Sequence, residues 1–169
     1  MSEKDSIAKN VAGRQILLRD VVESDLPIFF EHQLDPEANH MAAFTAEDPS
    51  NRDAFTTKMA KILADENVRI QTVIYKDQVV GNITYHHWFG DPEVSYWIDK
   101  QFWGKGIATS ALTQFLEQLE IRPLFARVVK DNLGSIRVLE KCGFEKHSED
   151  SGFANARGKE VEEFIFKLD

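Results

Sequence analysis

The sequence predicts a mixed α/β fold in which a mostly antiparallel sheet is flanked by helices. Segments rich in β-branched and aromatic residues alternate with segments whose apolar residues recur at helical spacing. Their order is strand, helices, two strands, strand–helix, strand–helix and two strands, which indicates one sheet covered by helices. The 169 residues suffice for one domain with its own core. We expect a flexible tail over residues 1–13 and a single domain over residues 14–169.

Composition limits the classes of function. With 43% hydrophobic and 28% charged residues, the chain is typical of a globular protein. No apolar run is long enough to span a membrane, and the polar N-terminus has no signal-peptide pattern. The net charge of −8 argues against nucleic acid as a partner and is compatible with cationic substrates or simply with solubility. Cys142 is the only cysteine, so no internal disulfide can form, and we expect a core role for it and a cytoplasmic location.

The first half of the chain should supply one strand, a set of helices and a hairpin. We expect a strand at 15–19, a helix capped by Ser24, a short helix at 37–43, a helix from Asn51 or Asp53 to Asp65, and strands at 68–75 and 79–88. Gly81, inside the second hairpin strand, indicates a bulge or a close backbone approach. His86 and His87 should point to opposite faces of that strand, so they do not suggest a shared metal, and we expect no metal site.

The second half should supply two strand–helix units and a closing strand pair. We expect a strand at 93–98, a helix at 107–120, a strand at 124–129, a helix at 131–142, and antiparallel strands at 144–149 and 161–168. Gly143 follows the second helix as its terminating glycine. The connection over 150–159 contains two glycines, and we expect it to be mobile.

The segment from Trp103 to Thr109 places two glycines where a strand gives way to a helix. Glycines allow a ligand to approach the backbone closely, and a helix start offers free N–H groups to an anion such as phosphate. The segment fits neither a P-loop nor a dinucleotide fingerprint, because the required further glycines are absent. It is therefore either a phosphate site of another kind or a tight strand-to-helix turn.

Two motifs resemble those of the Gcn5-related N-acetyltransferase (GNAT) family. The Trp103–Ala108 segment, Trp-Gly-Lys-Gly-Ile-Ala, is similar to the family's acetyl-CoA signature Arg/Gln-x-x-Gly-x-Gly/Ala, with Trp103 departing at the first position. Asn132-Leu133-Gly134-Ser135, followed by Gly143-Phe144, resembles the family's second segment. The branch that acetylates ribosomal-protein amino termini (RimJ/RimL-like) commonly carries Trp-Gly-Lys-Gly. The resemblance runs from about Gln15 to the C-terminus.

The resemblance implies a GNAT-type sheet with a V-shaped cofactor cleft between two central strands. In that arrangement the cleft opens between the strand ending at Ile98 and the strand starting near Leu124, and the pantetheine arm of acetyl-CoA fills it. A bulge in the first of these strands would aim an N–H at the thioester oxygen. The implied cofactor-binding residues are Trp97, Ile98, Asp99, Trp103, Gly104, Lys105, Gly106, Ile107, Ala108, Thr109, Asn132 and Ser135.

The same resemblance implies transfer of an acetyl group from acetyl-CoA to a primary amine by direct attack on the thioester. Such a reaction depends on alignment, on donors for the oxyanion and on removal of one proton. Glu93 is the first candidate for the base, or else a solvated edge carboxylate. Many family members carry a Tyr as the acid for the leaving thiolate where this chain has Leu139. In the branch that the chain resembles, Ser135 is a candidate to hydrogen-bond the thiolate instead, and Asn132 would hydrogen-bond the pantetheine arm or nearby backbone. Tyr96, His86 and His87 are weaker candidates for handling protons or contacting the substrate.

Two other classes of function remain open on the sequence. One is a non-catalytic acetyl-CoA-binding or regulatory module, which the missing Tyr favours. The other is a nucleotide-phosphate binder, which the lack of a Ser or Thr after Gly-Lys disfavours. The acceptor amine stays open between a protein N-terminus and a small molecule, and a homodimer is compatible with the sequence.

Overall fold

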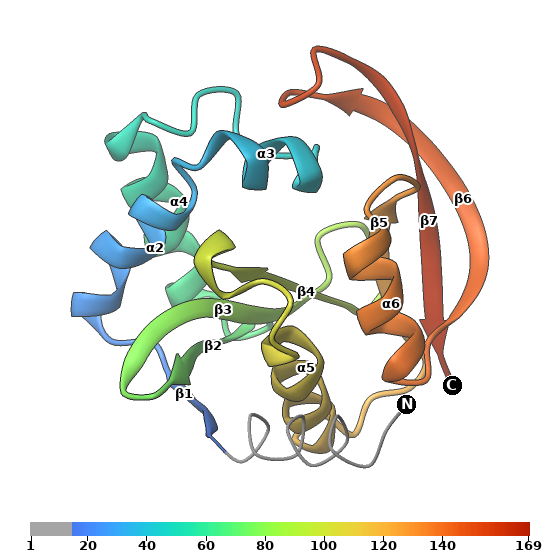
Figure 1. Cartoon of the computed structure of the whole chain (residues 1–169), viewed down its shortest axis with the longest axis horizontal. Coiled ribbons are helices and arrows are strands. Elements are labelled where there is room, and N and C mark those ends of the chain that lie inside the picture. Colours follow the sequence, from blue (N-terminus) through green and yellow to red (C-terminus); the bar gives the residue numbers. More distant parts are fainter. Residues whose placement is uncertain (1–14) are drawn as a thin grey trace.

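The computed structural model describes residues 15–169, which form a seven-stranded sheet with helices on both faces (Figure 1). The tail expected over residues 1–13 lies outside the described residues. The strand order is β1-β2-β3-β4-β5-β7-β6, antiparallel except between β4 and β5. This confirms the predicted mixed, mostly antiparallel sheet.

The elements follow the predicted order. They are β1 (Ile16–Asp20), the 3-10 turn η1 (Glu23–Asp25), α2 (Leu26–His32), α3 (Pro36–Ala42), α4 (Arg52–Ala64), β2 (Arg69–Tyr75), β3 (Gln78–His86), β4 (Glu93–Ile98), the 3-10 turn η2 (Lys100–Phe102), α5 (Ile107–Glu117), β5 (Leu124–Val129), α6 (Leu133–Lys141), β6 (Glu145–Ala154) and β7 (Lys159–Leu168). Helix α5 ends three residues earlier than predicted, and β3 ends before Trp88.

Two apolar layers hold the helices to the sheet. Helices α5 and α6 pack on one face through a core that includes Ile83, Leu112 and Phe115, whereas α2 and α4 pack through Phe29, Phe55 and neighbours on the other. Residues of β3 contribute to both layers because successive side chains of a strand point to opposite faces. Leu116 is buried as its helical spacing predicted, and Cys142 is half-buried against the first core.

The first helical segment does not begin as predicted. The residue that organises it is Asp25, not Ser24: its carboxylate accepts hydrogen bonds from Arg19 at 2.6 and 2.8 Å, from Thr72 at 2.7 Å and from the Val22 N–H at 3.0 Å. Burial by itself would raise the pKa of Asp25, but these bonds outweigh it and hold the pKa below its ordinary value. The carboxylate thus ties the 3-10 turn to β1 and β2.

The strands β4 and β5 meet at one end and diverge at the other. Their only paired residues are Glu93 and Phe125, next to a hydrogen bond from the Phe125 N–H to the Pro92 carbonyl at 2.9 Å. This junction lies at the amino ends of both strands and no pairing follows it, so their carboxyl ends separate beyond it. The resulting V has Glu93 at its apex, and its open end faces the start of α5.

Gly81 permits the close approach that its position predicted. A Cβ there would lie 2.1 Å from the Trp97 carbonyl oxygen, so only glycine fits between β3 and β4. The bulge implied for β4 is, however, not present in its pairing with β3, which runs in register from Gly81–Ile98 to His86–Glu93. The irregularity lies instead between β2 and β3, at Val73 and Ile74.

The β6–β7 hairpin is longer than predicted. Residues 150–154, expected to be a mobile connection, continue β6, and only 155–158 form the turn. The hairpin arches beyond β5 toward α3 (Figure 1), where the Ala156 N–H donates to the Ala43 carbonyl at 3.2 Å and Asn155 Nδ2 donates to the Thr45 carbonyl at 2.8 Å. Pairing with β7 and docking of the tip hold this segment in place.

Candidate active site

The glycine turn lies between the end of β4 and the start of α5. Gly104 and Gly106 have φ values of +77° and +78°, a region that favours glycine. Gly106 is the N-cap of α5, and no side chain caps that helix start. A Cβ added at either glycine would meet nothing within 4 Å, so the space above the turn is open. The free N–H groups and the helix dipole at an open surface fit a pyrophosphate group.

Trp103 and Asp99 fix this turn to the sheet. The Trp103 indole Nε1 donates to the Ile98 carbonyl at 2.8 Å, and Asp99 Oδ1 accepts from the Gln101 N–H at 3.3 Å. The Asp99 N–H donates to the Val80 carbonyl at 2.8 Å, so Asp99 and, by alternation, Trp97 direct their peptide groups toward β3. Trp97, Ile98 and Asp99 were expected to pair with pantetheine, but only the peptide groups of Ile98 face the cleft. The Ile98 carbonyl already accepts the hydrogen bond from the Trp103 indole.

Asn132 and Ser135 begin α6 on the opposite side of the cleft. Asn132 caps the helix, its Oδ1 accepting from the Ser135 N–H at 3.2 Å, while its Nδ2 donates to the Met41 carbonyl at 3.3 Å. Both polar atoms of this amide are therefore engaged within the protein. The hydroxyl of Ser135 lies 2.5 Å from that of Tyr96 on β4.

A cavity of about 970 Å³ joins the predicted catalytic residues on the β5 side of β4. Glu93, Asn132 and Ser135 all line it, together with Trp97, whereas the glycine turn lies outside its lining. The walls come from β2, β3, β4, β5, the start of α6, the helical region from α2 to α4 and the β6–β7 hairpin. The structure thus brings together the three residues proposed for chemistry and separates them from the glycine turn.

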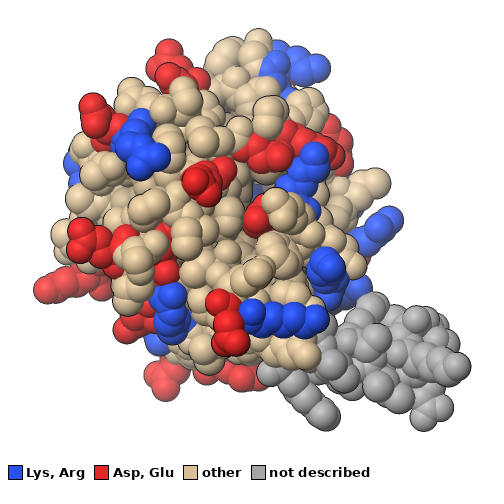
Figure 2. All heavy atoms as spheres, turned by 60° about the vertical axis from the view of Figure 1, so that its left-hand side comes forward, with Lys and Arg blue, Asp and Glu red and all other residues tan. Residues whose placement is uncertain are grey.

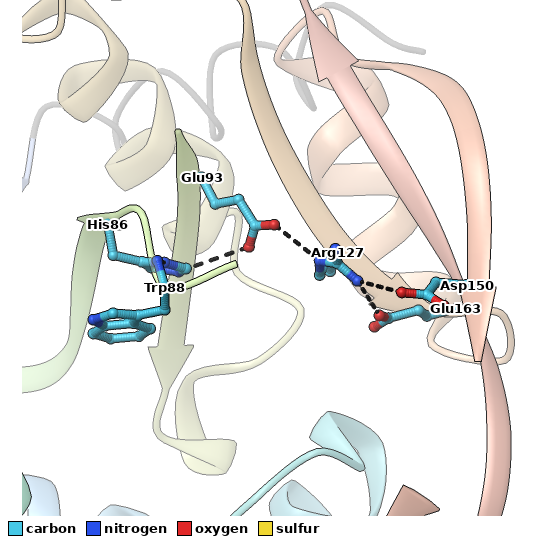
Figure 3. A network of polar contacts seen from close by, with 6 residues as sticks. All are labelled: His86, Trp88, Glu93, Arg127, Asp150 and Glu163. Atoms are coloured by element: carbon cyan, nitrogen blue, oxygen red, sulfur yellow. Dashed lines mark hydrogen bonds and ion pairs between the residues drawn. The ribbon is translucent and has the colours of Figure 1, made fainter. Parts of the chain in front are cut away.

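Glu93 belongs to a buried network of charges rather than to a solvated strand edge. It is 4% exposed, and its Oε1 accepts from Arg127 Nε at 2.8 Å. The Arg127 guanidinium also donates to Glu163 at 2.8 Å and to Asp150 at 3.0 Å, and Figure 3 shows it lying between Glu93 and these two carboxylates. His86 Nε2 lies 3.9 Å from Glu93 Oε2. The alternative of a solvent-exposed Glu93 is therefore wrong.

Burial sets the protonation states of this network. It raises the pKa of Glu93 above its ordinary value, although Arg127 opposes the shift. Burial, with His87 and Arg127 as further causes, lowers the pKa of His86 to about 4, so the ring is neutral at neutral pH. Because the Trp88 N–H donates to His86 Nδ1 at 3.3 Å, we assign the ring proton to Nε2, on the side of Glu93.

His86 and His87 point to opposite sides, as predicted. His86 lines the cavity and stacks on Trp88 at 3.9 Å between ring centroids (Figure 3), whereas His87 Nε2 lies 2.7 Å from the Tyr85 hydroxyl. Among residues 15–169, no group of three or more His, Cys, Asp or Glu side chains is arranged to hold a metal ion. Nor does any helix of that part of the chain have the length and apolarity to cross a membrane.

The rim of the cavity is aromatic, and its interior holds polar atoms without partners. Four exposed rings, Phe44, Trp88, Phe89 and Phe153, are among the lining residues. Three buried atoms of the lining have no hydrogen-bond partner in the described structure: Asn39 Oδ1, Thr45 Oγ1 and Trp97 Nε1. Buried polar atoms of this kind are costly unless a ligand or water satisfies them, so the cavity is suited to a partly polar ligand.

The sequence did not reveal several residues of this network. Arg127, Asp150 and Glu163 come from three strands, and only the tertiary structure places them around Glu93. One signal was available: Arg127 is the single charged residue of the strand Leu124–Val129, and a lone cation in such a strand needs buried partners.

Comparison with known proteins identifies relatives of this sequence and of its fold. The sequence model of the acetyltransferase (GNAT) domain family matches residues 15–145. An uncharacterized N-acetyltransferase, p20 of Bacillus licheniformis, is 23% identical over 167 residues, covering 91% of this chain and 92% of its own. Mycobacterium smegmatis RimJ, solved in complex with CoA-disulfide, has a TM-score of 0.76 at 20% identity, covering 90% of this chain and 81% of its own. Spermidine N-acetyltransferase of Vibrio cholerae, solved with CoA and spermine, has a TM-score of 0.77 at 16% identity, and the match covers 92% of this chain and 95% of that one.

The chain therefore belongs to the GNAT acetyltransferase family. It is an acetyltransferase enzyme whose co-substrate is acetyl-CoA. The non-catalytic binding module and the nucleotide-phosphate binder considered above are thereby set aside.

Proposed function

We propose that the enzyme transfers the acetyl group to a primary amine, either a protein N-terminus or a small-molecule amine, by direct attack on the thioester. The observation that carries the proposal is the placement of Glu93 and Ser135 in one cavity beside the V between β4 and β5. An amine entering this cavity meets the cleft where the cofactor would lie, with a carboxylate on one side and a hydroxyl on the other.

The cofactor would enter from the open end of the V. Its pyrophosphate would bind the turn formed by Trp103, Gly104, Lys105 and Gly106 and the first N–H groups of α5, from Ile107 to Thr109, because that helix start is uncapped and open. Its pantetheine arm would then run along the cleft edge of β4 at Ile98 toward Ser135. Asn132 contributes by fixing the start of α6 and thereby Ser135, since both of its polar atoms are engaged within the protein.

Glu93 is the proposed base. Its raised pKa makes the carboxylate a better proton acceptor than an ordinary Glu, while Arg127 beside it favours the ionised form. It would take the proton that the attacking amine loses, directly or through one water. Ser135 would donate a hydrogen bond to the leaving thiolate.

The charge of the cavity supports a cationic acceptor. Three carboxylates (Glu93, Asp150 and Glu163) surround the one guanidinium of Arg127, and His86 beside them is neutral. The group therefore carries an excess of negative charge, which attracts an ammonium group and opposes acidic acceptors. On the face shown in Figure 2, acidic and basic side chains are interspersed and the described atoms form no continuous basic surface, in keeping with an acceptor other than nucleic acid.

A thiol-release assay with acetyl-CoA and a panel of amines and peptides tests the proposal. Glu93→Gln should lower turnover by about 10²–10⁴-fold, the usual range for a positioned base, and Ser135→Ala should cause a smaller loss. Both variants should retain the rise in melting temperature that acetyl-CoA causes by binding the folded state. Near-normal turnover of Glu93→Gln at all pH values would remove Glu93 from the mechanism, leaving an enzyme that only aligns its substrates.

A further inference from the structure

Two hydroxyl groups face each other between β4 and α6. Tyr96 and Ser135 are 39 residues apart in the sequence, and their oxygens lie 2.5 Å apart. Both residues line the cavity that contains Glu93. Leu139, which follows Ser135 by one helical turn on α6, is 2% exposed in the core. The only phenol hydroxyl bonded to Ser135 therefore comes from β4, among the residues that the structure describes.

The direction of this hydrogen bond follows from the surroundings. Tyr96 packs against the apolar core that Ile83, Ala111 and Leu139 help to form, and within residues 15–169 its hydroxyl has Ser135 Oγ as its one hydrogen-bond partner. If Ser135 were the donor, the phenol proton of Tyr96 would have no acceptor there once the cofactor excluded water. A buried donor without an acceptor costs free energy, and donation by Tyr96 to Ser135 avoids that cost. Tyr96 is therefore the donor, and the proton of Ser135 is free to point elsewhere.

We propose that Tyr96 is a positioning residue: its hydroxyl donates to Ser135 and so holds the Ser135 O–H toward the sulfur of the acetyl thioester. The inference rests on the proposed function, because it assumes that the thioester sulfur lies beside Ser135.

The chemical step is balanced without a proton from Tyr96. The amine nitrogen attacks the carbonyl carbon, the carbon–sulfur bond breaks, and its electron pair leaves on sulfur, while Glu93 takes the amine proton. Ser135 donates a hydrogen bond to the thiolate, which then takes its proton from solvent. Burial raises the pKa of Tyr96 to about 12, well above that of a thiol, so Tyr96 keeps its proton throughout.

A double-mutant cycle tests the coupling between the two hydroxyls. Tyr96→Phe should lower kcat by about 5- to 20-fold, as for loss of one hydrogen bond, with little change in KM for acetyl-CoA. In a Ser135→Ala background, Tyr96→Phe should cause no further loss, because Tyr96 acts only through Ser135. Tyr75→Phe, which removes a phenol hydroxyl from the same core, is the matched control and should behave like wild type. Equal losses in both backgrounds, or no loss from Tyr96→Phe in an enzyme that Ser135→Ala impairs, would overturn the inference and leave the proposed function standing.

A second measurement needs no acceptor amine. The thiol of CoA bound to each variant can be titrated by the ultraviolet absorbance of its thiolate. A hydrogen bond from Ser135 stabilises the thiolate, so the pKa of the bound thiol should be lower in wild type than in Tyr96→Phe, and Tyr75→Phe should match wild type. Identical thiol titrations in wild type and Tyr96→Phe would overturn the inference, and amine turnover by wild type tests the proposed function separately.

Discussion

The glycine turn proposed for the cofactor and the cavity proposed for the acceptor are built in different ways. The turn consists of consecutive residues, Trp103 to Thr109, and its anion site depends on local backbone geometry: two glycines at positive φ and an uncapped helix start. The charged network of the cavity, made of Glu93, Arg127, Asp150 and Glu163, comes from β4, β5, β6 and β7. The family match covers the turn but ends at residue 145, before Asp150 and Glu163. The proposed phosphate site thus depends on a local motif, whereas the proposed acceptor cavity depends on contacts between distant strands, two of which, β6 and β7, supply carboxylates from beyond the matched region.

The largest expected effect concerns the turn. Gly106→Glu should abolish the acetyl-CoA-induced rise in melting temperature and with it turnover, because a side chain at φ +78° strains the turn and adds negative charge near the phosphates. Gly158→Glu is the matched control, since Gly158 also has a positive φ, of +63°, and open space around it, but lies in the β6–β7 turn. An unchanged melting shift in Gly106→Glu would show that phosphate binds elsewhere.

The next effect concerns the charges of the cavity. Arg127→Gln should lower the free energy of unfolding by about 3–5 kcal/mol, because it leaves Glu93 and Glu163 buried without their cation. Lys130 also holds two carboxylates of the same region, Glu149 and Glu162, but both are exposed. Lys130→Gln should therefore have a far smaller effect. Similar losses in the two variants, measured by denaturant unfolding, would contradict the idea that burial distinguishes the cavity.

The scaffold under the turn is tested by Leu116→Ala. Leu116 is 9% exposed and belongs to the core that holds α5 on the sheet. Its truncation should lower the free energy of unfolding by about 2–5 kcal/mol, toward the lower end because the side chain is near the end of the helix. Acetyl-CoA should still raise the melting temperature of the variant. A loss below about 0.5 kcal/mol would mean that this helix face contributes little to holding the turn.

The smallest expected effect is a shift in the titration of Glu93. Burial, opposed by Arg127 and aided by the negative charge of Glu163, raises its pKa above the ordinary 4.5. Glu163→Gln removes one negative neighbour and should move the midpoint down, measured by carboxyl carbon NMR with Glu93→Gln for assignment. Glu149→Gln, on the exposed Lys130 pair, should leave the midpoint in place. A midpoint in Glu163→Gln at or above that of wild type would contradict the electrostatic account of the cavity.

Much of the fold followed from the sequence, because strand alternation and helical spacing are local patterns. The element order, the glycine turn, the buried face of α5 and the close approach at Gly81 were all predicted. The start of the first helical segment was misplaced because Asp25 is held by Arg19 and Thr72, partners that capping patterns cannot reveal. The connection at 150–159 was mistaken for a mobile loop because its order comes from pairing with β7 and from docking against Thr45 and Ala43.

The sequence by itself determined the glycine turn, since backbone conformation at Gly104 and Gly106 depends on glycine and on the helix that follows. It also indicated Glu93 and Ser135 as candidates for chemistry. Only the tertiary structure decided their surroundings: that Glu93 is buried against Arg127, that Tyr96 lies beside Ser135, and that β6 and β7 supply the remaining carboxylates. Burial and charge pairing are properties of side chains brought together from distant segments, and a carboxylate or hydroxyl has no fixed environment until the sheet has formed.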